Sequence, residues 1–590
     1  MKKLLSVLVA LSLTLTMLIP ALAETADGTY TGSGAGLNGT ITVEVTVAAG
    51  KITDVKVVSH SETPGISDPA IEKIPAAIVE KQSADVETVS GATFTSNGIM
   101  AAVKDALGET EKSDAGIPFE QPDILVLGAG MAGIVTATRA AELGLNVLVL
   151  EANASVGGSA MVAGGTLLGA GTRMQKEAGI EDDPDLCFAD FVRLGGAGTF
   201  NEELGREFSQ ISGAAVDWLD DLGADFGDRK PYFGVYQPLN LARNYSGNGG
   251  AKAFVAALTK ELDNYIGKNA YIMLNTYVTG LLTDETGAVI GCKAKLADGT
   301  EAEVKAPATV VATGGYGGNK ELLTKYNFTN VLTTSPRCVT GDGYFWLQDL
   351  NAAFTNMDFC TSYAGGIETN PDDFRDFGYF NTQTGALWIN TAGERTIDEM
   401  GADSHDRSET WLRNDQNIVY TVFTKEMLDP EKKIFSTGAW GAKVEEFDPF
   451  MASLVEKGIG WQADSVEELA DKTGLPKEAF LATIKAYNDG CANGNDPFGR
   501  TAREIPMVNG PFYAVKTIPY VMITSGGPMM TKNCEVVNND GLVIKGVYMA
   551  GEIVGMANVG GLNSIGGMGH GNCLIWGKKA AEVIAERLGK

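Results

Sequence analysis

Three glycines at fixed spacing, Gly128, Gly130 and Gly133, have a pattern that predicts chemistry. They form a G-x-G-x-x-G motif between a predicted strand, residues 124–127, and a predicted helix, residues 132–143. In that context the first glycine permits the turn, the second lets the backbone approach a pyrophosphate, and the third packs helix against strand. The N-terminus of the helix also attracts negative charge. The motif therefore predicts a dinucleotide site.

A carboxylate stands at the end of the next predicted strand, residues 146–150. Glu151 lies 23 residues after Gly128, where it would accept hydrogen bonds from a ribose and repel a 2′-phosphate. A second run with the same glycine spacing, residues 34–39, has no apolar strand before it and no helix after it. We expect that second run to be a loop.

A cluster of small and hydroxyl residues, Ser90-Gly91-Ala92-Thr93-Phe94-Thr95-Ser96, precedes a predicted helix over residues 96–107. Taken alone, such a cluster predicts a helix N-cap, because a serine or threonine side chain accepts hydrogen bonds from the free N–H groups that open a helix.

The length of 590 residues predicts two or three domains, since one hydrophobic core does not grow to that size. The second unit opens with a strand, a helix and a strand, which predicts an α/β fold. Strand-then-glycine patterns recur at residues 309–315 and 546–551. The predicted parts begin with a targeting segment, 1–23, and a small α+β domain, 24–108, which has a hairpin over 40–58 and helices at 71–81 and 96–107. A linker, 109–122, follows. The rest is a dinucleotide-binding domain in two pieces, 123–349 and 516–590, with a capping domain inserted at 350–515.

The composition excludes some functions. A net charge of −28, from 74 acidic and 46 basic residues, argues against nucleic acid as a partner, because phosphate binding needs a basic face. The seven cysteines form no C-x-x-C pair, so we expect no metal, iron–sulfur or c-type haem site.

The N-terminus has the pattern of an export signal. Lys2 and Lys3 precede an apolar run over residues 4–19, and Ala21-Leu22-Ala23 is an A-x-A cleavage site. An uncleaved membrane anchor is the alternative. We expect a protein located outside the cytoplasm.

Further motifs resemble those of the fumarate reductase and succinate dehydrogenase flavoprotein family. In family order they are Gly157-Gly158-Ser159, Gly164-Gly165, Ala312-Thr313-Gly314-Gly315, Gly341-Asp342-Gly343, Ala550-Gly551-Glu552 and Gly566-Gly567. The resemblance covers about 122–590 and implies a Rossmann-like domain that binds one FAD non-covalently. It assigns to this cofactor Gly128, Gly130, Ala132, Gly133, Glu151, Gly158, Ser159, Gly164, Gly165, Val278, Gly314, Asp342, Glu552, Met568 and Gly569.

The first domain resembles FMN-binding domains of flavin-transferase substrates. The likeness lies in Asp27-Gly28-Thr29-Tyr30, Gly50-Lys51-Ile52, Glu62-Thr63-Pro64-Gly65 and the S-G-A-T motif that ends at Thr93. It implies an FMN held on Thr93 by a phosphoester, with Thr95 as the weaker candidate. Glu87 stands where the family usually has aspartate.

The likeness weakens at the expected substrate site. The family binds a dicarboxylate with histidines and arginines, but the matching segments here are Cys360-Thr361-Ser362, Gly378–Thr382, Ile523–Gly527 and Ser564, without those residues. A bidentate contact between arginine and carboxylate is among the stronger recognition elements. Fumarate and succinate are therefore not the expected substrates.

Several side chains are candidates near that site. Arg407 and Tyr379 are the candidate proton donors, with His405 behind them. His570 is expected near the flavin, and Tyr513 matches a position that lines the family's site. Gly393-Glu394-Arg395 and Glu399 match the family's G-K-R…E stretch.

Three functions remain open at this stage. The first is a reductase outside the cytoplasm that passes electrons from FMN to FAD and then as hydride to an activated C=C bond. The second is a dehydrogenase or oxidase of a steroid-like or enone substrate, and the third is a flavin electron carrier. The attached FMN domain favours reduction, and the capping domain argues against a simple carrier. The expected partners are a small-molecule substrate, a membrane or extracytoplasmic electron donor, and a flavin transferase.

Overall fold

The computed structural model divides into two compact units, residues 1–115 and 116–590. The predicted targeting segment and most of the predicted linker lie outside the described residues. No helix in the described part has the length and apolar character needed to cross a membrane. The structure describes residues 26–35, 40–60, 62, 67–89, 92–108, 121–234, 239–297, 299–380, 385–401, 415–428, 435–437, 440–442, 447–502 and 504–590.

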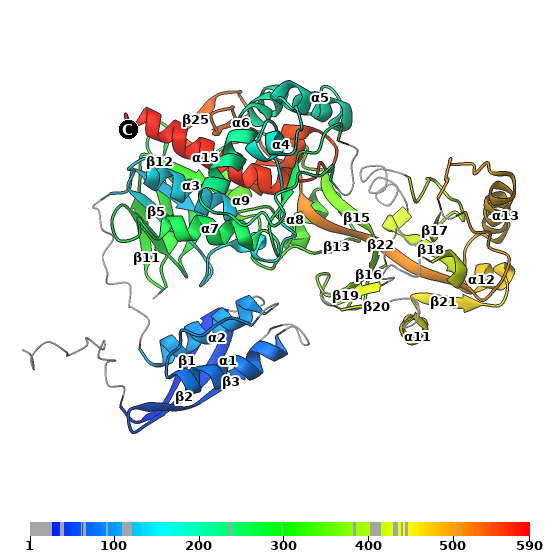
Figure 1. The fold of residues 1–590 in the computed structure, drawn as a ribbon, viewed down its shortest axis with the longest axis horizontal. Helices are drawn as coiled ribbons and strands as arrows, with labels where there is room; N and C mark the ends of the chain where they lie inside the picture. The colour runs from blue at the N-terminus through cyan, green and yellow to red at the C-terminus, as the bar shows by residue number, and fades with distance from the viewer. Residues whose placement is uncertain are drawn as a thin grey trace, which may run out of the picture. The chain divides into compact units, whose positions relative to one another are not determined.

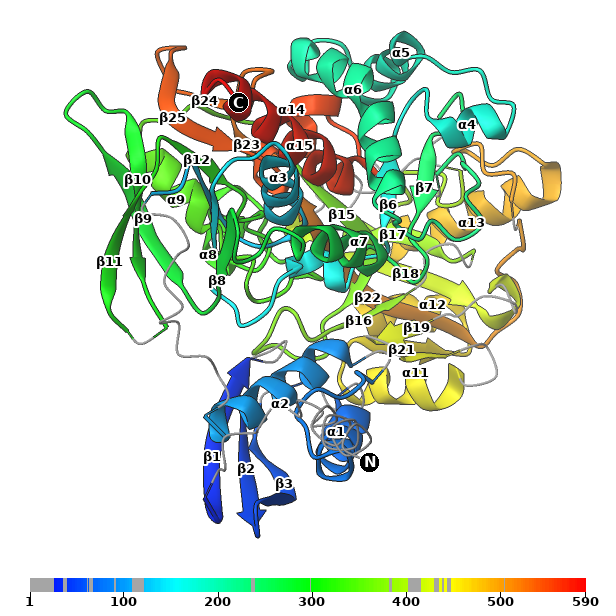
Figure 2. The same cartoon turned by 60° about the vertical axis from the view of Figure 1, so that its left-hand side comes forward.

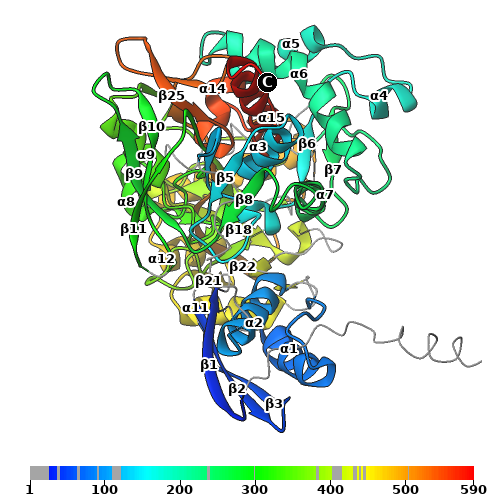
Figure 3. The ribbon, with the colours of Figure 1, turned by 90° about the vertical axis from the view of Figure 1, so that its left-hand side faces the viewer.

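The first unit is an antiparallel sheet with two helices on one face (Figure 3). Its elements are β1 (Gly28–Ala35), β2 (Thr40–Ala48), β3 (Lys51–Ser59), α1 (Asp68–Lys81) and α2 (Thr93–Ala106). Alternate residues of β2, such as Val43 and Val45, are fully buried under the helices, as a half-exposed strand requires. The predicted hairpin and both helices are present. The expected loop at residues 34–39 is wrong where it is described, because Gly34 and Ala35 end β1.

The second unit is built on a mostly parallel sheet (Figure 1). Its described strands run in the order β24-β25-β12-β4-β5-β8. Their bounds are β4 Ile124–Leu127, β5 Val147–Leu150, β8 Ala270–Met273, β12 Ala308–Val311, β24 Glu535–Val537 and β25 Val543–Met549. Every residue of β4, β5 and β12 is buried, as in a parallel sheet covered on both faces. The predicted strand-helix-strand beginning and both later strand-then-glycine patterns therefore belong to one sheet.

The strand order places a crevice beside β4. From β4 the chain moves one way to β5 and β8, and the other way to β12 and β25. Ligands of open α/β sheets bind where the order reverses, at the carboxyl ends of the strands. The helices of this layer are α3 Met131–Glu142, α4 Arg173–Glu177, α5 Pro184–Gly195, α6 Glu202–Asp221, α7 Lys252–Leu262, α8 Lys320–Lys325, α9 Asp342–Asp349, α14 Met556–Gly560 and α15 Met568–Arg587, with short 3-10 turns η1 Gly158–Met161 and η6 Glu552–Val554.

Smaller sheets border this layer. An antiparallel ribbon of β9, β10 and β11 leaves it beside β12 (Figure 2). Two short pairs, β6 with β7 and β14 with β23, lie near the glycine turns described below. Their bounds are β6 Thr166–Leu168, β7 Asn244–Ser246, β9 Tyr277–Thr283, β10 Val289–Lys295, β11 Glu301–Lys305, β14 Phe354–Thr355 and β23 Gly527–Pro528.

The inserted part forms an antiparallel sheet with its own core. Its long strand β22 (Phe512–Thr524) runs through the boundary at 515/516 that the sequence analysis assigns to the capping domain. The other strands are β13 Leu332–Thr333, β15 Cys360–Ile367, β16 Gly378–Phe380, β17 Leu387–Asn390, β18 Val419–Thr424, β19 Phe435–Thr437, β20 Trp440–Ala442 and β21 Gly460–Ala463, and the helices are α11 Phe447–Glu456, α12 Val466–Thr473 and α13 Lys477–Asn493. Four buried charged side chains, Arg395, Glu399, Asp496 and Arg500, pair with one another there.

Candidate functional site

The first glycine turn has the geometry that its motif predicts. Gly128 has a φ of 102°, which favours glycine. A Cβ on Gly133 would lie 1.8 Å from the carbonyl oxygen of Gly128, so only glycine allows α3 to pack this closely on β4. A Cβ on Gly130 would meet nothing within 4 Å. The chain therefore leaves open space at the one glycine through which a pyrophosphate is expected to approach.

Glu151 lies next to this turn. Its carboxylate accepts hydrogen bonds from the backbone N–H of Ala129 at 2.6 Å and from the backbone N–H of Asn153 at 2.8 Å. A Cβ on Gly158 would come 3.1 Å from the Cα of Gly130, so the second glycine motif lies against the first. The turn, the carboxylate and η1 thus form one neighbourhood.

The far side of the crevice follows β12. A Cβ on Gly128 would lie 2.7 Å from the carbonyl oxygen of Ala312, and Gly314 has open space where a Cβ would stand. The carboxylate of Glu552 accepts hydrogen bonds from the backbone N–H and the hydroxyl of Thr524, at 3.0 and 2.8 Å. Burial raises the pKa of Glu552. Glu552 therefore joins η6 to the end of β22.

Helix α15 begins beside β6. Gly567 is its N-cap, has a positive φ, and would place a Cβ 2.5 Å from the backbone of Leu167. Met568 is fully buried at the first position of the helix. The Nδ1 atom of His570 lies 3.1 Å from the carbonyl oxygen of Thr166, and burial lowers the pKa of this histidine. The first turn of α15 carries no acidic side chain, and the glycine turn before it is partly exposed.

The remaining predicted contacts lie around the same layer. Gly164 and Gly165 precede β6, and a Cβ on Gly165 would come 2.2 Å from the backbone nitrogen of Ala251. Asp342 opens α9 and accepts a hydrogen bond from the hydroxyl of Tyr277 at 3.0 Å. The other predicted residues have these positions: Ala132 on α3 against Gly551, Ser159 in η1, Val278 buried on β9, and Gly569 in the first turn of α15 against Ile523.

These residues fit a bound FAD. The open Cβ positions at Gly130 and Gly314 leave room along both sides of the crevice. Within the described part of the chain, the buried hydroxyl of Thr313 has no hydrogen-bond partner. A buried polar atom of this kind is normally satisfied, so a ligand that bonds it is expected.

We expect Gly130→Ala to weaken FAD binding while the fold stays intact. The added methyl group meets no protein atom but occupies the open space. Because overpacking costs about 1–3 kcal/mol, the Kd for FAD should rise roughly tenfold to a hundredfold. Titration of FAD into the cofactor-depleted chain measures it. Gly280→Ala is the matched control, since its Cβ also meets nothing within 4 Å but lies on β9. Equal FAD affinity in the two variants would contradict the assignment.

Three hydroxyls meet at positions that the family resemblance matches to substrate-binding segments. Thr361 on β15 and Ser525 just after β22 lie with their oxygens 3.2 Å apart. Ser564, between α14 and α15, donates to the Thr361 hydroxyl at 3.0 Å. All three are buried, Ser564 being the most exposed at 9%. The fold thus brings together three segments that the sequence analysis identified separately. We call these three uncharged, hydrogen-bonded side chains the hydroxyl row.

Tyr379, the candidate proton donor that the structure describes, is not part of this row. Tyr379 lies on β16 opposite Gly366 and packs on Tyr520 at 5.6 Å between ring centroids. Gly366 is separated from Thr361 by five positions of β15, roughly 15 Å of extended chain. Arg407 and His405 lie outside the described residues. Tyr379 and Arg407 remain predictions.

Three other candidates are engaged within the protein. Glu399 accepts hydrogen bonds from Arg395 and from the backbone N–H of Trp388. Arg395 also pairs with Asp496 at 2.7 Å. Tyr513 packs between Phe447 and Phe423 in the core of the capping part. Arg395 and Glu399 therefore hold the capping part together, a role that sequence reasoning missed.

The first unit places Thr93 at the start of α2. The N-cap is Ala92, which makes no side-chain hydrogen bond, so the predicted serine or threonine cap is absent. The nearby hydroxyls are used elsewhere: Thr95 donates to the carboxylate of Glu62 at 2.5 Å, and Ser96 donates to the carbonyl oxygen of Ala92. Both Thr95 and Glu62 are buried.

The doubly wound sheet, its glycine turns and the inserted capping sheet define a dinucleotide-binding oxidoreductase. The family model described as "FAD binding domain" matches residues 123–569, and the model described as "FMN-binding domain" matches residues 36–108. The chain therefore belongs to the FAD-dependent fumarate reductase family and carries an FMN-binding domain.

Several known proteins are similar to this chain in sequence or in fold. A urocanate reductase of Eggerthella lenta is 27% identical over 573 residues, which cover 93% of this chain and 91% of that protein. An NADH:fumarate oxidoreductase of Klebsiella pneumoniae is 29% identical over 88% of this chain, but this chain spans only 54% of that longer protein. The open structure of a flavocytochrome c3 fumarate reductase has a TM-score of 0.60 at 24% identity, covering 85% of this chain and 84% of that chain.

The family fixes the coarse chemistry. The chain is a flavin-dependent reductase that acts on C=C bonds, and its cofactors are FAD and FMN. FAD, when bound, supplies hydride chemistry, and FMN supplies single-electron transfer.

Proposed function

We propose that this chain is an exported reductase of a small organic acceptor whose activated C=C bond is conjugated to an uncharged group, and that fumarate is not its substrate. A flavin transferase attaches FMN to Thr93, and a donor in the membrane or outside the cytoplasm supplies the electrons. The N-terminal signal pattern supports export. Arg407 is our first candidate for the proton donor, and Tyr379 is the second.

The neutral hydroxyl row carries the proposal on substrate. Three O–H groups, on Thr361, Ser525 and Ser564, make two hydrogen bonds with one another. One O–H therefore has no acceptor within the row and is available to an uncharged oxygen of a ligand. Because Ser564 donates to Thr361, the spare O–H belongs to Thr361 or to Ser525, and this is the part of the row that we expect to meet the substrate oxygen.

The same row explains why a dicarboxylate is a poor fit. Hydrogen bonds to charged groups contribute about 1.5–3 kcal/mol each, whereas neutral ones contribute about 0.5–1.5 kcal/mol. A dianion placed against hydroxyls would lose most of its hydration without the two missing arginines that would hold its carboxylates. An amide, ester or ketone loses less hydration and needs only the one O–H.

Three compounds of one skeleton test this proposal. Fumarate, its monoamide and its diamide carry the same C=C bond with two, one and no negative charges. With a reduced dye as donor, kcat/KM should rise along this series. The diamide should exceed fumarate by roughly a hundredfold, because two charge-assisted contacts are missing.

Larger neutral enones test whether the substrate is bulky. A cyclic enone and a steroid-like enone should be reduced at least as well as the diamide if the acceptor is bulky. Preference for fumarate over its diamide would overturn the proposed substrate class while leaving the FAD and FMN assignments unaffected.

A further inference from the structure

The side chain of Asn244 on β7 is buried without a partner. Only 1% of the residue is exposed. Among the residues that the structure describes, neither its Nδ2 nor its Oδ1 makes a hydrogen bond. A buried amide that loses water on both atoms and gains nothing is strongly unfavourable, so native chains keep one only where something else completes it.

The position of Asn244 indicates what completes it. Asn244 pairs with Leu168 on β6, the strand that follows the Gly164-Gly165 turn. Its Nδ2 lies 2.7 Å from the point where a Cβ on Gly566 would stand, so any larger residue there would press on the amide. The amide thus lies against the Gly566 turn, on a strand whose partner follows the Gly164-Gly165 turn, and the family resemblance associates both turns with the flavin cofactor.

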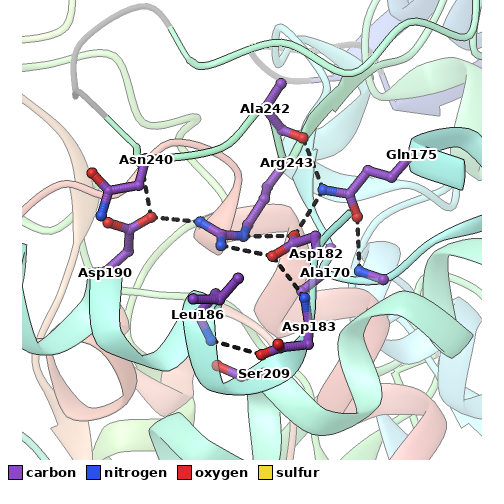
Figure 4. A network of polar contacts seen from close by, with 12 residues as sticks. Ala170, Gln175, Asp182, Asp183, Leu186, Asp190, Ser209, Asn240, Ala242 and Arg243 are labelled. Carbon is purple, nitrogen blue, oxygen red and sulfur yellow. Dashed lines mark hydrogen bonds and ion pairs between the residues drawn. The ribbon is translucent and has the colours of Figure 1, made fainter. Parts of the chain in front are cut away.

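Asn244 cannot easily turn away from this place, because its neighbour is clamped (Figure 4). Arg243 is fully buried and pairs with Asp182 at 2.7 Å and with Asp190 at 2.5 Å. The backbone of Asn244 also exchanges two hydrogen bonds with Tyr232, each at 3.0 Å. The strand is therefore fixed on both sides of the unsatisfied amide.

We propose that the Asn244 amide hydrogen-bonds the redox-active ring of FAD through the imide edge of that ring. A carboxamide presents an acceptor oxygen and an NH₂ group with two N–H donors, both bonded to the same carbon. An imide edge presents carbonyl acceptors beside an N–H donor, which is the complementary pattern. A substrate carbonyl would satisfy only the Nδ2 half of the side chain, so the flavin completes both atoms and the substrate does not.

The test compares Asn244→Leu with the unaltered full-length chain, with FAD loaded and with FAD removed. Leucine keeps the branching at Cγ and removes both polar atoms. Without FAD, the melting temperature of the variant should equal or exceed that of the unaltered chain, because an unpaired amide has been removed. With FAD, its Kd should rise about tenfold or more, for the loss of two hydrogen bonds. The visible absorption of the bound flavin should shift as well.

Asn558→Leu is the matched control. Asn558 is equally buried, but its amide is paired: Nδ2 donates to the carbonyl oxygen of Val554, and Oδ1 accepts from Asn356. This variant should melt lower without FAD. Asn244→Ser provides a smaller side chain in case leucine prevents folding, and it should also weaken FAD binding and shift the flavin spectrum.

The outcomes separate the possible roles of Asn244. A lowered melting temperature without FAD, together with an unchanged Kd, would mean a structural role and overturn the proposal. An unchanged Kd and spectrum with a raised KM would mean a substrate contact and also overturn it. No change in the melting temperature, the Kd, the spectrum or the KM would mean that water hydrogen-bonds the Asn244 amide, and this result would also overturn the proposal. Each result is independent of whether the acceptor is charged.

Discussion

Replacing Thr93 with alanine should leave the denatured protein colourless, whereas the unaltered chain, made together with a flavin transferase, should stay yellow after its FAD is released. A phosphoester needs the hydroxyl oxygen, so the variant cannot carry FMN. Its FAD content should be unchanged, because that cofactor belongs to the second unit. Turnover with a one-electron donor should stop, since FMN is the group expected to accept single electrons.

The structure of the first unit sharpens this expectation. Thr93 opens α2, but the cap is Ala92, so helix capping does not account for the threonine. The Thr95 hydroxyl is buried on Glu62 and is not available for attachment without breaking that contact. Thr95→Ala should therefore keep its FMN if it folds.

Thr53→Ala is the matched control for Thr93→Ala. Thr53 is an exposed threonine of the same unit whose hydroxyl donates only to the carbonyl oxygen of Thr46. Mass spectrometry of the intact chains measures the FMN directly. A Thr93→Ala chain that still carries a covalent flavin, or an unaltered chain that carries none, would exclude this attachment site.

The dinucleotide-binding core could be predicted because its signals are local. The strands β4, β5 and β12 are short runs of valine, leucine, isoleucine, alanine and one threonine that are buried on both faces, and the glycine turn follows β4 directly. Periodicity and turn chemistry are sufficient for such elements. The family motifs then extended the prediction to residues far apart in the chain.

The error at residues 34–39 has a physical cause. A loop is expected there because no apolar strand precedes the run and no helix follows it, but Gly34, like the earlier Gly32, lies in β1 under α2. A Cβ on Gly32 would come 2.2 Å from the carbonyl oxygen of Ala102, and one on Gly34 would come 2.2 Å from that of Gly98. Glycine in a strand can mark the close approach of another backbone. That approach depends on a helix more than 60 residues away, which no local pattern reveals.

Long-range contacts explain what else was missed. The helix α2 starts three residues earlier than predicted, at Thr93, and in this first turn Thr95 donates to the distant Glu62. The contact between Thr361 and Ser564 joins positions 203 residues apart. The buried carboxylate Asp190 could have been noticed from the sequence, because it stands within the apolar stretch of α5.

We expect Arg243→Met to lower the free energy of unfolding by about 3–5 kcal/mol, the usual cost of breaking a buried ion pair from one side. Arg243, Asp182 and Asp190 are all fully buried. Burial alone would lower the pKa of Arg243, but the hydrogen bond with Asp182 and the neighbouring charges raise it, so the guanidinium stays charged. Methionine fills similar space but leaves Asp182 without a cation. Urea unfolding followed by tryptophan fluorescence measures the loss.

An exposed ion pair is the control that shows how much of the unfolding cost comes from burial. Lys485 and Asp489 lie one helical turn apart on α13, with side chains 75% and 56% exposed. Lys485→Met should change the free energy of unfolding by no more than about 0.5 kcal/mol, because water screens such pairs. Equal losses in Lys485→Met and Arg243→Met would contradict the argument that desolvation sets the cost.

The double variant Arg243→Met, Asp182→Asn distinguishes two causes of the lost stability. One is the missing attraction between the ions, and the other is the penalty of a buried carboxylate that has no cation. It removes one positive and one negative charge, and Asp190 keeps its ion pair with Arg193. If the cost of Arg243→Met comes mainly from an uncompensated buried carboxylate, neutralising Asp182 should restore part of the stability, although more of the native network is gone. Losses that add up over the two substitutions would instead mean that each hydrogen bond contributes on its own. The sign of this coupling therefore decides whether the cluster stabilises β7 by attraction or only avoids the penalty of an unpaired charge.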